Sequence, residues 1–454
     1  MAIMDDSLPE IKAFFASATR ISYLRQMVIR FMISILIRHG RNSCMNAASV
    51  VDSKPLHRAQ PARFLLKWRS GIASLLSVAL RQLLRGEDWN GRYLLIIDST
   101  MIGLQGTTTE NTYSTGNRKR RPAEHRRYSK HKYAYRSCHC FVFGLLIAPS
   151  GVRVPTYLPY YTGPYAKSKK LKRRTQAQLA AQIIDELPVP PGIELIVLGD
   201  TAFDAKIVRE SCQKRGWHWI TPVNANRVFA GKRGSRPRVS SHIEHLSTNR
   251  FQTIRIHPSS GSYCKQRRLS EHRNESKKTT RTFHVCSEKR EVHSVGMVML
   301  VFSSTKPIKG KAKRESTKVL MTNATHLSSR QVVELYGMRW QIALLFKELK
   351  STLGMHQYRL KRFEAVESWI DVVLITFCYL EWTRQRKLSD RRITLEERQR
   401  WQRQRSYGLR QAVLIGIQIR QHKWIAKRLK SKHGRKTLTK TYTALLAREY
   451  RCAA

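Results

Sequence analysis

The sequence predicts an α/β protein with helical regions at both ends, and three observations support that fold class. Short apolar runs, at 93–98 and 193–198, have the length and composition of buried strands. Segments with helical periodicity alternate with such strands. The segment 224–318 is rich in Ser, Arg, Lys and Gly and holds short strand-like pieces, which indicates a β-rich insertion. At 454 residues the chain is long enough for about three domains.

Residues 1–90 are expected to be helical. Capping-box spacing at 7–10 opens an apolar-periodic run, and 21–38 and 64–85 have the periodicity of two further helices. We interpret this region as a small DNA-binding domain. A helical module that only packs against the rest of the chain is an equal alternative.

The elements that follow come in a recognisable order. They are strands at 93–98, 134–148 and 152–159, a helix at 176–187, a strand at 193–198, a helix at 205–215 and a strand at 217–223. This is the order of a ribonuclease H-like core, so we assign its first part to 91–223. The β-rich insertion at 224–318 would be followed by the second part of the core at 319–385, with helices at 328–353 and 365–385. A basic helical region, 386–454, completes the chain.

The charge of the chain is strongly unbalanced. Lys and Arg number 84 against 31 Asp and Glu, a formal net charge of +53. Because like charges repel, a polyanion is the natural partner, and nucleic acid is the one we expect. Hydrophobic residues make up 41% of the chain and aromatic residues 9%, which excludes a wholly disordered basic protein. A merely solvated basic surface is the alternative.

Membrane and secreted classes are not expected. The longest apolar stretch of the C-terminal half, 369–382, is interrupted by Asp371 and Glu381 and is shorter than a span requires. Residues 1–11 lack the basic start of a signal peptide. The eight cysteines are scattered without a CxxC pair, which fits a reducing cytoplasm, and Cys138-His139-Cys140 indicates a strand rather than a metal site.

Two aspartates stand at the ends of apolar strands, Asp98 and Asp200. Carboxylates at the ends of adjacent strands in an α/β sheet can point into one crevice. Their oxygens are the ligands that Mg²⁺ prefers, and two such ions support phosphoryl transfer. The alternative is capping, since Asp200 precedes a predicted helix. For Asp204 we favour a carboxylate that complements a helix dipole over an accessory acid.

Two basic runs join elements of the predicted core and suit a DNA backbone. Residues 117–136 hold nine Lys or Arg and one acid, and 167–174 hold six Lys or Arg. Solvated loops are the alternative for any one residue. The residues expected to contact DNA are Arg118, Lys119, Arg120, Arg121, Arg126, Arg127, Lys169, Lys170, Lys172, Arg173 and Arg174.

A third motif begins at Tyr336, where the chain reads Tyr-Gly-Met-Arg-Trp-Gln-Ile-Ala-Leu-Leu-Phe-Lys-Glu-Leu-Lys. This stretch resembles the Tyr-x2-Arg-x3-Glu-x6-Lys signature of bacterial insertion-sequence transposases of the DDE type, in insertion sequence family four. Asp98-Ser99-Thr100 and Gly199-Asp200-Thr201 look like the two aspartate motifs of that family, in the right order. The resemblance covers about residues 91–385.

The resemblance implies a cut-and-paste transposase. Such enzymes bind terminal inverted repeats of double-stranded DNA as a homodimer or larger synaptic complex. Mg²⁺-dependent hydrolysis nicks a strand, and the freed 3′-OH attacks the target DNA. Asp98 and Asp200 would then bind two Mg²⁺ ions, with Mn²⁺ as the substitute, and Tyr336, Arg339 and Lys350 would contact phosphates near the cleaved end. The implied location is the bacterial cytoplasm, at the nucleoid.

Position 343 departs from the signature. The third catalytic carboxylate belongs there, and Ala343 cannot bind a metal. A deliberate Glu→Ala substitution that traps an uncleaved complex is the favoured explanation, and natural loss of activity is the second. Rescue by Glu348 is disfavoured because five residues turn a helix by about 140° beyond one full turn. We therefore expect impaired catalysis.

Three rival functions stay open. They are a transposase-derived DNA-binding protein without catalysis, a hydrolytic nuclease without strand transfer, and a binder of structured RNA.

Aromatic residues could hold a base flipped out of the DNA, as in well-known relatives. Trp340 lies on an apolar helix face, so core packing is the better expectation for it, and at least one of Trp217 and Trp219 should be buried. The remaining candidates in the insertion are Phe229, Phe251, Tyr263, Phe283 and Phe302.

Overall fold

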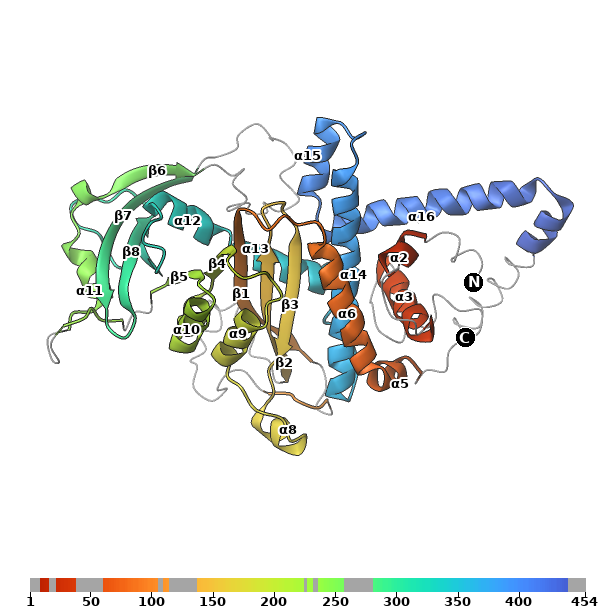
Figure 1. The fold of residues 1–454 in the computed structure, drawn as a ribbon, viewed down its shortest axis with the longest axis horizontal. Coiled ribbons are helices and arrows are strands. Elements are labelled where there is room, and N and C mark those ends of the chain that lie inside the picture. Colours follow the sequence, from red (N-terminus) through yellow and green to blue (C-terminus); the bar gives the residue numbers. More distant parts are fainter. Residues whose placement is uncertain are drawn as a thin grey trace, which may run out of the picture. The chain divides into compact units, whose positions relative to one another are not determined.

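The computed structural model describes residues 9–15, 22–37, 60–104, 109–113, 137–223, 227–231, 236–256 and 281–439. The chain divides into two compact units. The helical unit comprises 1–86, 102–138 and 346–454, and the sheet unit comprises 87–101 and 139–345. Figure 1 shows both units and labels most of their helices and strands.

The sheet unit is built on a mixed sheet of nine strands, in the order β3-β2-β1-β4-β5-β9-β8-β7-β6. The strands are β1 (Arg92–Gly103), β2 (Cys138–Ile147), β3 (Arg153–Pro159), β4 (Glu194–Leu198), β5 (His218–Pro222), β6 (Gln252–Ile256), β7 (Arg281–Val292), β8 (Gly296–Ser304) and β9 (Thr317–Thr322). Strand β4 pairs in parallel with β1 and with β5. The pairs β2–β3, β5–β9, β9–β8, β8–β7 and β7–β6 are antiparallel.

The expected strands and helices of the core are present, and the arrangement is a mixed α/β fold. It is consistent with a ribonuclease H-like arrangement. The strands of the expected insertion, β6 to β8, extend the same sheet, because β8 pairs with β9. The domain boundaries proposed from the sequence stay predictions.

Helices cover the sheet and position its strand ends. They are α8 (Gly163–Ser168), α9 (Gln176–Asp185), the 3₁₀ turn η1 (Thr201–Phe203), α10 (Lys206–Lys214), α11 (Val239–His242), the 3₁₀ turns η2 (Ile243–His245) and η3 (Thr248–Arg250), α12 (Ser329–Gly337) and α13 (Trp340–Lys347). Helix α9 begins with a capping box between Thr175 and Gln178 and packs on α10 and β3. A Cβ on Gly144 of β2 would lie 2.8 Å from Ile183 of α9, so this glycine permits a close approach.

The single helix expected at 328–353 is interrupted. Helix α12 ends at Gly337 and α13 begins at Trp340. The amides of Met338 and Arg339 bond to carbonyls three residues earlier, so the chain turns more tightly there than an α-helix. A π-helical turn, η5 (Glu348–Thr352), ends the segment.

The helical unit is centred on the long helix α14 (Phe363–Ser389). The other helices are α2 (Pro9–Phe14), α3 (Ser22–Ile37), α5 (Gln60–Lys67), α6 (Arg69–Leu84), α15 (Leu395–Arg403) and α16 (Ser406–Leu429). All of them contact α14. The middle of α14 is apolar on every side, which suits a helix buried by several neighbours.

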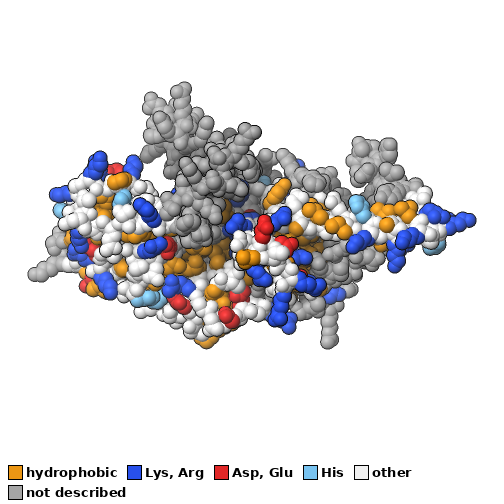
Figure 2. All heavy atoms as spheres, turned by 90° about the horizontal axis from the view of Figure 1, so that it is seen from above, with side chains coloured by type: hydrophobic (Ala, Val, Ile, Leu, Met, Phe, Trp, Pro, Cys, Tyr) orange, Lys and Arg blue, Asp and Glu red, His pale blue; other side chains and the backbone are white. Residues whose placement is uncertain are grey.

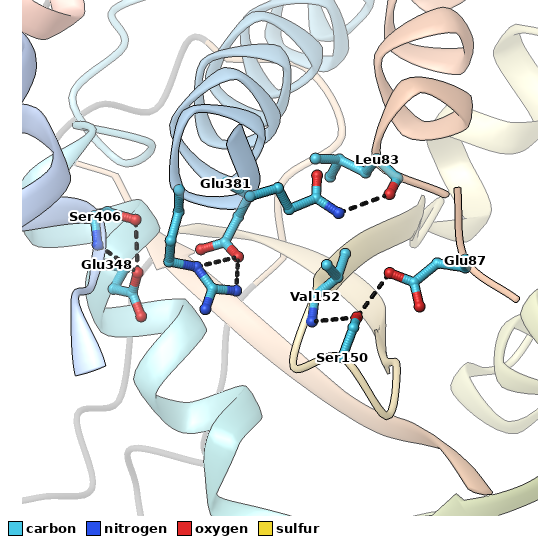
Figure 3. Close-up of polar contacts among 9 residues, drawn as sticks. Leu83, Glu87, Ser150, Val152, Glu348, Glu381 and Ser406 are labelled. Atoms are coloured by element: carbon cyan, nitrogen blue, oxygen red, sulfur yellow. Dashed lines mark hydrogen bonds and ion pairs between the residues drawn. The ribbon is translucent and has the colours of Figure 1, made fainter. Parts of the chain in front are cut away.

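Polar groups on α14 are paired within this unit. The buried Arg384 guanidinium donates to Glu381 at 2.6 Å, and the Gln385 amide donates to the Leu83 carbonyl at 3.0 Å (Figure 3). Among the helices that the structure describes, none is both long enough and apolar enough to cross a membrane.

Candidate active site

Asp98 and Asp200 stand at the same level on neighbouring strands. Strands β1 and β4 are parallel, and their last registered pair is Ile96 with Leu198. Each aspartate follows its member of that pair by two residues. Adjacent strands lie about 4.8 Å apart. The structure therefore brings together the two carboxylates that the sequence singled out.

The electrostatics of Asp98 reflect this pairing. Burial, and after it the negative charge of Asp200, raise the pKa of the Asp98 carboxyl to about 6. The Ser99 amide donates to Asp98 Oδ1 at 2.8 Å, and the Arg339 guanidinium lies 3.4 Å from Oδ2. Both contacts favour the charged carboxylate without cancelling the two opposing effects. Two close, repelling acids of this kind are suited to binding a cation.

Asp200 also performs the capping role considered as its alternative. Its Oδ1 accepts a hydrogen bond from the Ala202 amide at 2.9 Å, at the start of η1. Capping and cation binding are compatible, since a carboxylate offers two oxygens.

Two cations surround the ring of Tyr336. The Arg339 guanidinium carbon lies 5.7 Å from the ring centroid, and the Lys318 ammonium lies 4.5 Å from it. Burial raises the pKa of Tyr336 to about 12, against the effect of Arg339, so its hydroxyl remains neutral. Partial desolvation, and then the charge of Arg339, lower the pKa of Lys318.

Sequence reasoning missed Lys318. The residue is exposed on β9 between buried Thr317 and Val319. It belongs to no motif, and a lysine in a strand usually indicates only a solvated face. Lys318 lies beside Tyr336 only because α12 packs near β9, and the sequence alone does not predict that packing.

Ala343 lies inside α13, four residues after Arg339, which stands in the break before that helix. Within the part of the chain that the structure describes, no group of three or more His, Cys, Asp or Glu could hold a metal. The site thus contains two carboxylates, with an alanine in the third position of the signature.

Trp340 contradicts the expectation of core packing. Its side chain is 52% exposed, because the break before α13 turns this residue outward while Gln341 and Ile342 are buried. Trp217 and Trp219 are both buried, as are Phe229, Phe283 and Phe302. Phe251 is partly exposed, and Tyr263 lies outside the described residues.

Glu348 and Lys350 lie in the helical unit. The Glu348 carboxylate accepts hydrogen bonds from the amide and the hydroxyl of Ser406, at 2.9 and 2.6 Å, at the start of α16 (Figure 3). It is buried in this role, which agrees with the view that it does not replace the missing carboxylate. Burial, and then the charge of Lys350, lower the pKa of the nearby His356. The phosphate contact expected for Lys350 stays a prediction.

The structure describes only the second of the two basic runs. Arg118, Lys119, Arg120, Arg121, Arg126 and Arg127 lie outside the described residues. The second run connects α8 to α9, where Lys170, Lys172 and Arg173 are exposed and Lys169 and Arg174 are partly buried. Lys169 lies over the Tyr165 ring at 5.8 Å from its centroid. Contact of this run with DNA stays a prediction.

Asp204 directly precedes the N-cap of α10, as expected from the sequence, and it also forms two ion pairs. Its side chain is 1% exposed and forms ion pairs with Arg209 and with Arg227, the latter at 2.9 Å. The Arg227 guanidinium also donates to the Asp204 carbonyl at 3.1 Å. These contacts join the turn that follows Asp200 to the segment after β5.

The family model described as a transposase DDE domain matches residues 164–379. The matched range includes Asp200 and the whole Tyr336–Lys350 motif and begins after Asp98. No curated protein matches the chain. The match supports a DDE transposase, an enzyme of the nuclease and transposase class whose substrates are DNA.

Proposed function

We propose that this chain is a DDE transposase that moves an insertion sequence by cut-and-paste, and that it is impaired in cleavage at position 343. The observation that carries the proposal is the pairing of Asp98 and Asp200 on neighbouring strands, with Arg339 at Asp98. The match to the transposase DDE domain gives independent support. In this proposal the protein acts as a homodimer in a synaptic complex with terminal inverted repeats and target DNA, in the bacterial cytoplasm.

The core we propose is ribonuclease H-like. The strand order β3-β2-β1-β4-β5, with β4 parallel to both β1 and β5, supports it. Asp98 lies within β1, which continues to Gly103 and so does not end at this acid as the sequence suggested, while Asp200 follows the end of β4. The pair thus lies at the carboxyl end of β4, where ligands bind in open α/β sheets.

The acid pair fits one divalent cation. Two carboxylates of which one has a pKa raised to about 6 repel each other, and Mg²⁺ or Mn²⁺ would relieve that repulsion with the oxygen ligands it prefers. A second ion would need a further carboxylate, and Ala343 does not provide one. Mg²⁺ bound there supplies Lewis-acid stabilisation to phosphoryl transfer.

The cationic residues then act on the DNA strand. A phosphate that approaches Asp98 and Asp200 is repelled by both carboxylates, so nearby positive charge is needed to hold it. Arg339 and Lys318 provide that charge, and the neutral Tyr336 hydroxyl can donate a hydrogen bond to a phosphate oxygen. Lys350 and the run 169–174 are further phosphate contacts in this proposal.

Trp340 is suited to stacking on an unpaired base at this site. It is exposed and directly follows Arg339 in the chain. An aromatic side chain can stack on any base, at about 1–3 kcal/mol per base. Phe229, Phe283 and Phe302 are buried, so they do not offer a comparable surface.

Ala343 also favours a second candidate function, a transposase-derived DNA-binding protein that no longer cuts. The two functions share every DNA contact proposed above. They differ in whether a carboxylate restored at position 343 brings cleavage back.

The test compares the wild-type chain with Ala343→Glu and with Ala343→Gln, a control of matched size without charge. Labelled duplexes would carry the inverted repeats that flank the coding sequence, with Mg²⁺ present. The transposase proposal expects nicking and joined products from Ala343→Glu alone. Binding by all three proteins without cutting supports the non-cutting derivative instead. Cutting without joined products supports a hydrolytic nuclease.

A further inference from the structure

The C-terminal half of α16 carries three exposed lysines on one side. Lys423, Lys427 and Lys430 are spaced by four and three residues, which places them within about 60° of one another round the helix axis. Lys430 is the C-cap residue and keeps helical backbone angles. We call these three residues the lysine row.

The row has no acidic neighbour along the chain. Between residues 398 and 448 the sequence contains no Asp or Glu. Like charges four residues apart destabilise a helix. Two helical cations elsewhere do have an acidic partner four residues on, in the pairs Lys206–Glu210 and Arg330–Glu334. The charge of the row is thus left for something outside the helix to neutralise.

The helix dipole explains only part of this pattern. Cations in the last turn of α16 are favourable because the dipole is negative there. The chain turns at 430–431 and is helical again over 432–439, where Lys432, Arg435 and Lys436 are exposed in the first turns. Cations at a helix N-terminus oppose the dipole. Local helix stability therefore does not account for these three residues.

The buried residues of α16 lie in its N-terminal half, before the lysine row. Leu409, Val413 and Ile417 are buried, and α16 contacts α14 and α3. A basic helix that lies on a lipid surface needs a free apolar face opposite its cations. Ile415, Ile419 and Leu429 are also exposed on α16, so the choice of a hydrophilic polyanion over a lipid surface rests on the six cations and on the proposed function.

We propose that the lysine row, with Lys432, Arg435 and Lys436, binds the phosphate backbone of double-stranded DNA at a place separate from the acid pair. Figure 2 shows blue Lys and Arg side chains gathered over the region that Figure 1 assigns to the end of α16. The row is about 10 Å long at 1.5 Å per residue, close to three base-pair steps at 3.4 Å. Contacts of this kind hold DNA without reading its sequence. The choice of duplex DNA rests on the proposed function.

The experiment compares the full chain with the triple variant K423Q/K427Q/K430Q. The matched control is K214Q/K309Q/K313Q, which removes the same charge from exposed lysines of the sheet unit. The probe is a fluorescein-labelled 30-base-pair duplex of arbitrary sequence, titrated at several KCl concentrations. Circular dichroism should show that helix content is kept, because Gln removes repulsion within the row.

The expected result is a salt slope of log K reduced by about 2–3 in the row variant, with binding roughly tenfold or more weaker at 200 mM salt. The control should lose less than one unit of slope. If the wild-type chain binds duplex and the row variant binds equally well, the proposal for the lysine row is overturned, while the proposed function still stands. If the wild-type chain does not bind duplex, the proposed function fails with it.

Two further measurements separate other partners. Loss of binding to vesicles of anionic phospholipid, with DNA binding unchanged, would overturn the proposal in favour of a membrane surface. A changed oligomeric state by light scattering, with the salt slope unchanged, would overturn it in favour of self-association.

Discussion

The guanidinium of Arg339 lies 3.4 Å from the carboxylate of Asp98, so the residue that leads into α13 is joined to β1 across 241 positions of sequence. This ion pair connects two motifs recognised separately in the sequence. It also sets the charge balance of the acid pair, since Arg339 opposes the effects of burial and of Asp200.

The first prediction concerns that balance. Asp200→Asn should lower the pKa of Asp98 from about 6, because it removes a like charge, and Arg339→Gln should raise it, because it removes an opposite one. A pH titration by NMR of protein labelled at the aspartate carboxyl carbons measures both shifts. Equal pKa values in the two variants would contradict the charge coupling.

The raised pKa of Asp98 has a consequence for stability. Relative to the ordinary pKa of 3.8, the stabilising effect of protonation is fully present below about 4 and is lost as the pH rises through about 6. Asp98→Asn should therefore raise the unfolding free energy at pH 7.5, by at most about 3 kcal/mol, and by much less at pH 4.5. Denaturant unfolding without divalent ions tests this. A gain of equal size at both pH values would point to a cause other than ionisation.

Replacing Glu348 is expected to lower stability rather than raise it. Its carboxylate holds the amide and the hydroxyl of Ser406 in a buried place, so Glu348→Ala should destabilise the protein by about 1–3 kcal/mol. Divalent-cation binding by the folded protein should be unchanged. Calorimetric titration with Mn²⁺ alongside denaturant unfolding separates the two effects. Loss of Mn²⁺ binding at full stability would make Glu348 a ligand.

Lys318 should be unusually reactive. Since desolvation and Arg339 lower its pKa, more of its amine is neutral at pH 8–9 than for an ordinary exposed lysine. Competitive acetylation followed by mass spectrometry should label it faster than Lys309, and bound duplex DNA should protect Lys318 more than Lys309. A rate no higher than that of Lys309, or no protection, would remove Lys318 from the DNA contact.

The sequence predicts the acid pair well because its signal is local. A short apolar run followed by Asp identifies each strand, although β1 continues past Asp98 to Gly103, and the parallel register then brings Asp98 and Asp200 to one level. Contacts between residues that lie far apart in the chain cannot be predicted from local sequence patterns. Lys318 meets Tyr336 only through the fold, and Glu348 finds Ser406 58 residues away. The exposure of Trp340 follows from a helix break that periodicity alone does not reveal.

The central claim is that Asp98 and Asp200 form a divalent-cation site whose third carboxylate is missing at position 343. Binding of Mn²⁺ followed by electron paramagnetic resonance, without DNA, tests it most directly. We expect Asp200→Asn to abolish binding and Ala343→Glu to tighten it at least about tenfold, as a third oxygen ligand completes the site. Ala343→Gln should bind much less tightly than Ala343→Glu. Equal Mn²⁺ affinity in the wild-type chain, Ala343→Glu and Asp200→Asn would contradict the account.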